Sequence, residues 1–415
     1  MDKVVFLSGT TRGATLEGIG RSLARGFGDI GMECVEISLL DRENLLRRIR
    51  SIAFDQVRLV YSWVSMGMDL MMTGANGREF NLWRDLRVPF VSFHGDSPAY
   101  FFDRHIVPGA NFVTLYGFDE HCALRRRLPA RHGMVGTLDP IVLDEIPRES
   151  VDFAAKKEGT LLLLKNGKDP ERLKRYWKTC LEGFLLEAML EMAGFLEKHM
   201  DDGSCDQIDD VVLRYFHERD FEIEELLKTR LFFVAQLDDY IRAVKCTLMA
   251  EALMDFPVEI RGNEWEHVDF SRGRAKYIDE CDYAKSIGLI RGSLGMIDMS
   301  PNTSSNAHDR VSRAYGSHSL CLTNRQRFLE GLPHAERFTF AFQKESIQER
   351  VADLLAHREE ALEMGAETAA AYRERHPARQ LVQRMLDCAA LARLNQSTRR
   401  PAGSQDFFVW PPVKL

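Results

Sequence analysis

Short apolar segments alternate with helical stretches through the first ~150 residues. Five of these segments have the pattern of buried strands, and they cover residues 4–8, 33–37, 57–62, 88–94 and 111–116. Helix candidates, such as residues 18–28, lie between them. Strands that are joined through helices run parallel in one sheet, with the helices packed on both faces. The pattern therefore predicts an α/β fold with a doubly wound sheet.

A second series of the same kind begins after the polar segment 146–159. Its strands are expected at residues 160–164, 258–260, 294–299, 319–323 and 337–342. Residues 170–254 are helical in pattern, apart from the acidic loop 201–206, and this is more than one crossover helix needs. We therefore predict two Rossmann-like domains, residues 1–150 and 160–390, with a helical insertion at about 170–254. The apolar tail, residues 391–415, is expected to pack on the body.

Two facing doubly wound domains would bring the carboxyl ends of both sheets to one cleft. Ligands of open α/β sheets bind beyond the carboxyl ends of the strands, where the strand order reverses. The expected organisation is thus that of a two-domain transferase, with residues 1–150 on the acceptor side.

Composition narrows the class of protein. The 415 residues include 55 Lys and Arg against 62 Asp and Glu, a net charge of −7, which argues against a nucleic-acid partner. Eight cysteines without a Cys-x-x-Cys pair, the absence of a signal-peptide layout and the lack of a bilayer-length apolar run favour a cytoplasmic protein. Membrane contact would then be peripheral. No His-Glu-x-x-His or Asp-x-Asp pattern occurs, so no metal is expected.

The loop after the first strand is rich in glycine. It reads Gly9-Thr10-Thr-Arg12-Gly13 and continues to Gly18-Ile-Gly20. No Gly-Lys-Ser/Thr follows, as a phosphate-binding P-loop requires, and Leu stands where a dinucleotide fingerprint has its third glycine. The segment is either a flexible strand–helix turn or a cleft loop in which Thr10, Arg12 and Gly13 contact acceptor or donor.

Residues 93–105 follow the fourth expected strand and carry the candidate catalytic groups. Asp96 and, second to it, His94 would sit at the carboxyl edge of the sheet, where either could remove a proton from an acceptor hydroxyl. Asp96 could instead, or in addition, cap a helix that Pro98 opens. An apolar wall from Tyr100 or Phe101 would raise the pKa of Asp96 and make it a better base.

Two strands of the second series end in a cation followed by glycine. These segments read Arg261-Gly262-Asn263 and Lys165-Asn-Gly, and both cations could reach a diphosphate. An ordinary turn with an exposed cation is the alternative for each. The basic cluster Arg125–Arg127, with Arg131 and His132, is interpreted as solvated helix surface, although it could meet an acidic glycan or a membrane face.

A helix start at His308-Asp309-Arg310 follows the polar loop after the strand at 294–299. Asn302 and Asn306 lie in that loop. An anion at such a helix start would meet free backbone N–H groups, the positive end of the helix dipole and Arg310. We therefore predict that nucleotide phosphates bind here.

Residues 290–386 resemble the carboxy-terminal domain of bacterial glycosyltransferases of the spore-maturation type, within glycosyl transferases group 1. The shared pattern is a strand, a polar loop, His308-Asp309-Arg310, a helix with Ala314 and Gly316, and a strand that ends in Thr323-Asn324. Upstream, 261–265 and 276–278 are similar to the middle strands of the family. The resemblance implies the GT-B fold, a nucleotide-sugar donor on the second domain and no required metal. Together with the two cation–glycine segments and the helix start at His308, the resemblance leads us to expect these donor-binding residues: Lys165, Arg261, Gly262, Asn263, Tyr277, Asn302, Asn306, His308 and Arg310.

The chain departs from this pattern at Arg313, where many relatives have Glu. The donor contacts are then rearranged, or the donor sugar differs, or activity is lost. No cofactor is expected beyond the nucleotide sugar as co-substrate.

The expected activity is transfer of a sugar from the donor to a hydroxyl of a glycan, lipid-linked or protein acceptor, as in cell-surface polysaccharide biosynthesis. Lys165, Arg261 and Arg310 would stabilise the leaving diphosphate, and Asp96 would be the base if the reaction inverts. The alternatives are a nucleotide-sugar epimerase or hydrolase on the same fold, and a non-catalytic scaffold protein that keeps it.

Overall fold

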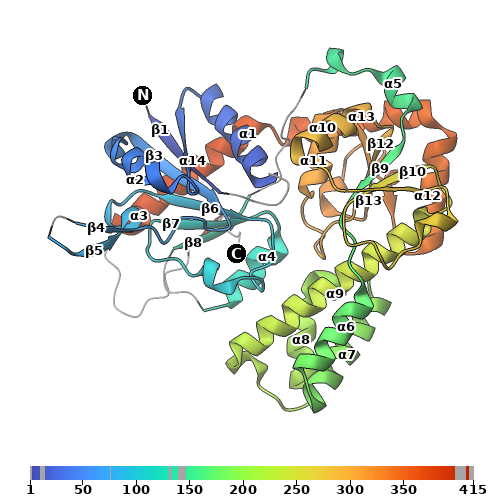
Figure 1. The fold of residues 1–415 in the computed structure, drawn as a ribbon, viewed down its shortest axis with the longest axis horizontal. Coiled ribbons are helices and arrows are strands. Elements are labelled where there is room, and N and C mark those ends of the chain that lie inside the picture. The colour runs from blue at the N-terminus through green and yellow to red at the C-terminus, as the bar shows by residue number, and fades with distance from the viewer. Residues whose placement is uncertain are drawn as a thin grey trace. The chain divides into compact units, whose positions relative to one another are not determined.

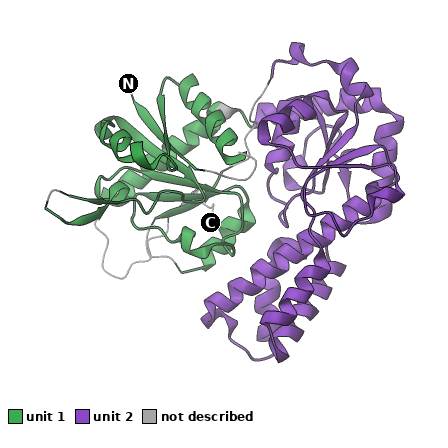
Figure 2. Cartoon of the chain, viewed as in Figure 1, with its two compact units in different colours: residues 1–143, 376–415 green, residues 144–375 purple. Residues whose placement is uncertain are grey.

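The structure is a computed structural model that describes residues 2–9, 15–74, 76–129, 133–138, 146–397 and 408–410. The chain forms two compact units (Figure 2). Unit 1 contains residues 1–143 and 376–415, and unit 2 contains residues 144–375.

Unit 1 is built on a seven-stranded sheet in the order β15-β8-β7-β6-β3-β1-β2, and every strand pair in it is parallel. Its strands are β1 (Lys3–Ser8), β2 (Glu33–Ser38), β3 (Val57–Trp63), β6 (Phe90–His94), β7 (Phe112–Tyr116), β8 (Met134–Thr137) and β15 (Phe408–Trp410). Its helices are α1 (Thr15–Asp29), α2 (Arg42–Arg50), α3 (Leu82–Asp85), α4 (Asp119–Arg127) and α14 (Ala378–Ser397). A hairpin of β4 (Met71–Thr73) and β5 (Glu79–Asn81) stands apart from the sheet.

The central strands of unit 1 are apolar because both faces of the sheet are covered. Val4 to Leu7 of β1 are at most 1% exposed. Helix α1 approaches the sheet closely at Gly20, where an added Cβ would lie 2.1 Å from the Phe6 ring. The hydroxyl of Tyr61 donates to the Gly20 carbonyl at 2.8 Å, which ties the helix to β3. A side chain at position 20 would force the helix off the sheet.

Unit 2 contains a six-stranded parallel sheet in the order β11-β10-β9-β12-β13-β14. This is the strand order 3-2-1-4-5-6 of a Rossmann domain, and the order reverses between β9 and β12. The strands are β9 (Leu161–Leu164), β10 (Val258–Arg261), β11 (Lys276–Ile278), β12 (Gly295–Ile297), β13 (Leu320–Asn324) and β14 (Thr339–Phe340). The helices outside the insertion are α5 (Phe153–Glu158), α10 (Tyr283–Gly292), α11 (Asp309–Gly316), α12 (Lys344–Ala356) and α13 (Arg358–Arg375).

The helical insertion comprises α6 (Pro170–Cys180), α7 (Gly183–Lys198), α8 (Ile208–His217) and α9 (Leu227–Leu253). The first three pack against the early part of α9, away from the sheet (Figure 1). A buried ion pair joins α8 to α9, since Arg230 donates to the two Asp209 carboxylate oxygens at 2.7 and 2.6 Å. The later part of α9 joins the core beneath the sheet through Met249 and Leu253. Helix α9 thus links the insertion to the nucleotide-binding-like sheet.

Unit 2 ends at residue 375, whereas the sequence predicted that the second domain would extend to residue 390. Helix α14 belongs to unit 1, where it packs against α1 and the sheet. Arg393 donates to the Val57 carbonyl at 2.7 Å, and Asn395 donates to the Ala110 carbonyl at 3.2 Å. Strand β15 then pairs with β8. The apolar periodicity of a helix predicts that it covers a sheet, but not which of two sheets it covers.

None of the described helices is long and apolar enough to cross a membrane.

Candidate functional site

The carboxyl ends of β9 and β12 meet at the point where the strand order of unit 2 reverses. Lys165 directly follows β9, and Asp298 directly follows β12. The Lys165 ammonium has no hydrogen-bond or ion-pair partner among the described residues. Burial lowers the pKa of Lys165 to about 8, and the positive charges of Arg310 and Arg242 act in the same direction. An ammonium in this setting has the charge and the free N–H groups that an anion would need.

Arg310 is held by a carboxylate rather than left free. Its Nε donates to Oδ1 of Asp298 at 2.6 Å, and its Nη2 donates to the Met299 carbonyl at 3.3 Å. Asp298 is fully buried, and its Oδ2 has no hydrogen-bond partner among the described residues. Burial would raise the pKa of Asp298, but Arg310 and His308 bring it below its ordinary value. The pair keeps the guanidinium at the switch point and offsets much of its charge.

His308 caps helix α11, as the sequence placed it at a helix start. Its Nδ1 accepts from the Arg310 backbone N–H at 3.4 Å. The same nitrogen lies 2.6 Å from Oδ1 of Asp309, and a proton on Nδ1 would replace the cap by a hydrogen bond to that oxygen, because one ring nitrogen cannot accept and donate at once. Arg313 donates to the other Asp309 oxygen at 2.6 Å and to the Ser286 hydroxyl at 2.7 Å, and is 8% exposed. Arg313 is therefore a buried ion-pair residue between α11 and α10.

Asn302 is buried in contacts with helix α9. Its amide nitrogen donates to the Asp238 carbonyl at 2.9 Å and to the Asp238 carboxylate at 3.0 Å. Its amide oxygen accepts from Lys245 at 3.0 Å. These bonds attach the loop after β12 to the insertion. Asn306, further along the loop, is half-buried.

The loops after β9 and β10 dock on each other. The Gly167 N–H donates to the Asn263 carbonyl at 2.8 Å, and the Asn166 side chain accepts from the Asn263 N–H at 2.9 Å. A Cβ on Gly262 would lie 2.1 Å from the Lys165 carbonyl oxygen, so this glycine allows the close approach. Gly262 and Asn263 thereby position Lys165.

The other residues predicted along β10 and β11 are engaged with their neighbours. Arg261 forms an ion pair with Glu259. Tyr277 is 39% exposed and stacks on Phe270, with ring centroids 5.2 Å apart. Their strands, β10 and β11, lie on the β9 side of the sheet, so β9 separates them from the switch point between β9 and β12.

In unit 1, Asp96 follows β6 and is exposed, with no hydrogen-bond partner among the described residues. The expectation that it caps a helix at Pro98 is wrong, because residues 98–101 form turns and the next helical turn is a 3-10 segment, Phe102–His105. Phe101 is 68% exposed, so it forms no wall that would desolvate a carboxylate.

His94 is buried in a polar cluster beneath this loop. Its Nε2 lies 3.1 Å from the Ser65 hydroxyl and 3.0 Å from the Ser92 hydroxyl. Burial, with the neighbouring charges of His105 and Arg125, holds the pKa of His94 well below its usual value. His94 is thus a neutral imidazole in a network with two serines.

The remaining predicted residues fall into two groups. Thr10, Arg12 and Gly13, as well as Arg131 and His132 of the basic cluster, lie outside the described residues. Arg125 is buried, which corrects the interpretation of the cluster as solvated surface at this residue. Its guanidinium donates to the carbonyls of His105 at 2.9 Å and of Leu128 at 3.3 Å.

Two features of the site were missed in the sequence. Asp298 was placed inside a strand and given no role. Arg242 and Lys245 belong to the insertion, yet Arg242 contributes to the charge around Lys165 and Lys245 binds Asn302. The spacing of Asp238, Arg242 and Lys245 puts all three on one helix face, and this spacing is the signal that could have identified them.

No group of three or more His, Cys, Asp or Glu side chains in the described part of the chain could hold a metal ion.

Residues 242–387 match a protein family described as glycosyl transferase-like. The matched segment runs from α9 to α14 and contains β10 to β14. An alpha-glucosyltransferase solved in complex with UDP superposes with a TM-score of 0.51 at 9% identity, over 94% of this chain and 100% of that one. The T4 phage BGT in complex with its UDP-glucose substrate gives 0.50 at 7% identity, over 94% and 99%. No curated protein matches the sequence.

Two Rossmann-like units and these structural neighbours define the GT-B fold. The chain thus has this fold, and residues 242–387 of unit 2 carry the match to the glycosyl transferase-like family.

Proposed function

We propose that the protein transfers a sugar from a nucleotide-sugar donor to a hydroxyl of a glycan, lipid-linked or protein acceptor, without a metal ion. The nucleotide phosphates bind at the carboxyl ends of β9 and β12 in unit 2. The observation that carries this proposal is the unpaired Lys165 ammonium at the switch point, with its depressed pKa. Lys165 is half-buried and has no direct ion-pair partner among the described residues, and a phosphate oxygen would supply one.

The helix start at α11 contributes less than Lys165. Free N–H groups and the helix dipole favour an anion there. However, Asp309 occupies the first turn and its carboxylate opposes an incoming anion, although Arg313 offsets part of that charge. Arg310 is likewise balanced by Asp298. Lys165 is the cation in this group without a carboxylate partner among the described residues.

The chemistry follows from the leaving group. As the bond between the sugar and the nucleoside diphosphate breaks, negative charge develops on the departing oxygen, and a fixed cation stabilises that charge. Lys165 supplies it, and Arg310 adds a partly compensated one. In unit 1, the exposed Asp96 carboxylate is the proposed base for the acceptor hydroxyl if the reaction inverts, with His94 second to it.

The test uses a panel of nucleotides and their sugars with the full chain. UDP is tried first, because the neighbouring structures were solved with UDP or UDP-glucose, followed by GDP and ADP. A diphosphate that binds raises the melting temperature through mass action. Its radiolabelled sugar is then tested for transfer and for hydrolysis, with EDTA and with added Mg²⁺ or Mn²⁺.

Each outcome has a defined meaning. Transfer that survives EDTA supports the whole proposal, and transfer that requires Mn²⁺ rejects its metal-independent part. Binding followed by hydrolysis or epimerisation alone indicates the alternative enzyme classes. Binding without turnover indicates a scaffold that kept the site. A chain that binds none of the nucleotides refutes the proposed donor site.

A further inference from the structure

The polar loop after β12, residues 300–307, leads into the start of helix α11. Met299, just before the loop, accepts a hydrogen bond from Arg310 through its carbonyl, and His308, just after it, caps α11. The first part of the loop, residues 300–303, is buried although most of it is polar. Whatever fixes this loop therefore also fixes Arg310 and the helix start.

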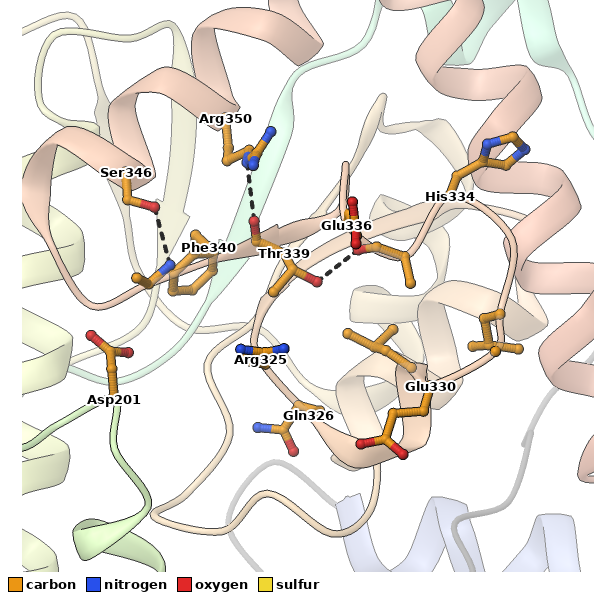
Figure 3. Close-up of a pocket in the computed structure, with 15 residues that line it drawn as sticks. Asp201, Arg325, Gln326, Glu330, His334, Glu336, Thr339, Phe340, Ser346 and Arg350 are labelled. Carbon is orange, nitrogen blue, oxygen red and sulfur yellow. Dashed lines mark hydrogen bonds between the residues drawn. The ribbon is translucent and has the colours of Figure 1, made fainter.

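The segment after β13 holds the loop from one side. Asn324, the last residue of β13, accepts from the Ser300 N–H at 2.9 Å. Gln326, labelled in the pocket of Figure 3, donates to the Thr303 carbonyl at 3.2 Å. Buried backbone groups need such partners, because an unpaired one costs as much as a lost hydrogen bond. These bonds fasten the loop to the sheet of unit 2.

Helix α9 of the insertion holds the loop from the other side, through Asn302. The Asn302 amide nitrogen donates to the Asp238 carboxylate at 3.0 Å, and its amide oxygen accepts from Lys245 at 3.0 Å. Asp238 and Lys245 are about two turns apart on one face of α9. A carboxylate only accepts and an ammonium only donates, so the two charges fix which way the amide points.

The Lys245 ammonium has this amide as its acceptor. Lys245 is 3% exposed and has no carboxylate partner in the described part of the chain. Its ammonium lies 4.5 Å from the centroid of the Phe342 ring. Phe342 is itself held by the insertion, because Asp201, labelled in Figure 3, accepts from its N–H at 3.0 Å. A buried ammonium with these partners is costly for stability, and a role in placing Asn302 accounts for it better.

We propose that Asn302 is a positioning residue of the donor site. It fastens the loop to α9, so that Arg310 and the start of α11 are already in place when the nucleotide diphosphate arrives. Both N–H groups of its amide are used on Asp238, and the side chain is 5% exposed. Asn302 thus acts through the loop, rather than as the direct donor ligand that the sequence predicted. The inference rests on the proposed function and gives the insertion a part in it.

A double-mutant cycle on the full chain tests this proposal. Asn302→Ala and Lys245→Met each break the bond from one side and leave a buried polar group without its partner, which lowers stability. The double variant leaves neither group stranded, so part of the lost stability returns. Tyr240→Phe is the matched control, because its lost hydrogen bond joins α9 to Glu197 of α7 rather than to the loop.

Three measurements are made on each chain. The melting temperature reports stability. Calorimetry, below the lowest of these temperatures, reports the affinity of the folded chain for UDP, GDP or ADP, whichever binds the parent. Hydrogen exchange of the amides in residues 300–311, without nucleotide, reports how firmly the loop is held.

We expect both single variants and the double variant to bind the nucleotide about tenfold more weakly. A loop that is in the binding arrangement in roughly a tenth of the molecules lowers the apparent affinity by that factor. Amide exchange in the loop should be faster by about the same factor in all three. The control should match the parent in both affinity and exchange.

The double variant separates positioning from stability. If the bond only stabilised the fold, affinity would return with stability in the double variant, and that result overturns the proposal. It is also overturned if Lys245→Met binds as the parent does while Asn302→Ala binds weakly, because Asn302 would then contact the nucleotide itself. Unchanged exchange in all three variants overturns it as well.

Failure of the proposed donor site gives a different result. If the parent binds none of the three nucleotides, that site is refuted and this proposal falls with it. If the parent binds and all the variants bind equally well, only the role of Asn302 is rejected.

Discussion

Arg310 and Asp298 form a buried ion pair at the switch point of unit 2, with Nε and Oδ1 2.6 Å apart. The carboxylate is fully buried, so neither charge can be removed without exposing the other to an apolar interior. Asp298→Asn should therefore destabilise unit 2 by about 3–5 kcal/mol, the usual cost of breaking such a pair. Hydrogen exchange of the β12 and α11 amides measures the loss.

The pair also changes what is expected of Arg310. A residue that only bound phosphate could be replaced by Ala without loss of stability, but Arg310→Ala also leaves the buried Asp298 carboxylate without its counterion. The double variant Asp298→Asn/Arg310→Met should recover part of the stability that either single variant loses. Glu359→Gln, which breaks the exposed Lys157–Glu359 pair, is the control and should leave the exchange rates unchanged. Additive losses in the double variant would argue against coupling.

Lys165→Met should weaken UDP binding by about 1.5–3 kcal/mol, the range for a hydrogen bond to a charged group. Calorimetry on the folded variant measures this directly. The control is Lys168→Met in the same loop, since Lys168 is paired with Asp239 at 2.6 Å. Equal losses for the two variants would show a general charge effect rather than a contact at Lys165.

The pKa of about 8 at Lys165 makes nucleotide affinity depend on pH. Above that pH the free protein has lost the ammonium proton, and an anion must recover it to bind. Affinity for UDP should therefore be constant near pH 7 and fall by up to ~10-fold per pH unit above about 8. The UDP phosphate, with its last pKa roughly 6, stays ionised throughout.

Lys165→Arg should flatten this pH profile, because a guanidinium remains charged. The same pKa shift makes folding stability rise with pH, whereas it makes UDP affinity fall. Since the unfolded lysine holds its proton to higher pH, the Lys165 contribution to stability rises with pH between about 8 and its ordinary 10.5. A profile for the arginine variant as steep as that of the parent would assign the titration to another group.

Asp96→Asn should abolish most turnover, by roughly 10²–10⁴-fold, while UDP affinity stays unchanged. The side chain is exposed and makes no hydrogen bond within the described residues, so stability should not change. Single-turnover transfer of the labelled sugar measures the effect. Asp103→Asn, a few residues further on in the 3-10 turn, is the control. A wild-type rate for Asp96→Asn would remove it as the base and leave His94 to be tested.

Arg313→Glu should destabilise unit 2, because it places a carboxylate next to Asp309 and removes the bond to Ser286. Arg313→Met loses the ion pair without adding repulsion, so it should be less destabilised than the Glu variant. Melting temperatures compare the two. If the Glu variant is the more stable, the ion pair with Asp309 is not what retains arginine at this position.

Much of the architecture was predictable because a parallel sheet covered on both faces requires continuous apolar strands, and these stand out in the sequence. The helix start at His308 was also found, since its polar loop and cap are local. The partner of Arg310 was not found, because a single aspartate at the end of an apolar strand carries no periodic signal. The exposed state of Asp96 depends on how residues 97–101 turn, and proline alone suggested a helix. Side-chain pairing across distant segments decides such details.

Unit 1 is closed by residues from both ends of the chain, through α14 and β15, whereas unit 2 is one continuous segment, residues 144–375. A ribosome therefore releases every residue of unit 2 before it releases the last helix and edge strand of unit 1. The face of the unit 1 sheet that α14 covers therefore stays exposed until unit 2 has been synthesised. Unit 1 is thus the last of the two units to be completed, although its first strand is the first to appear.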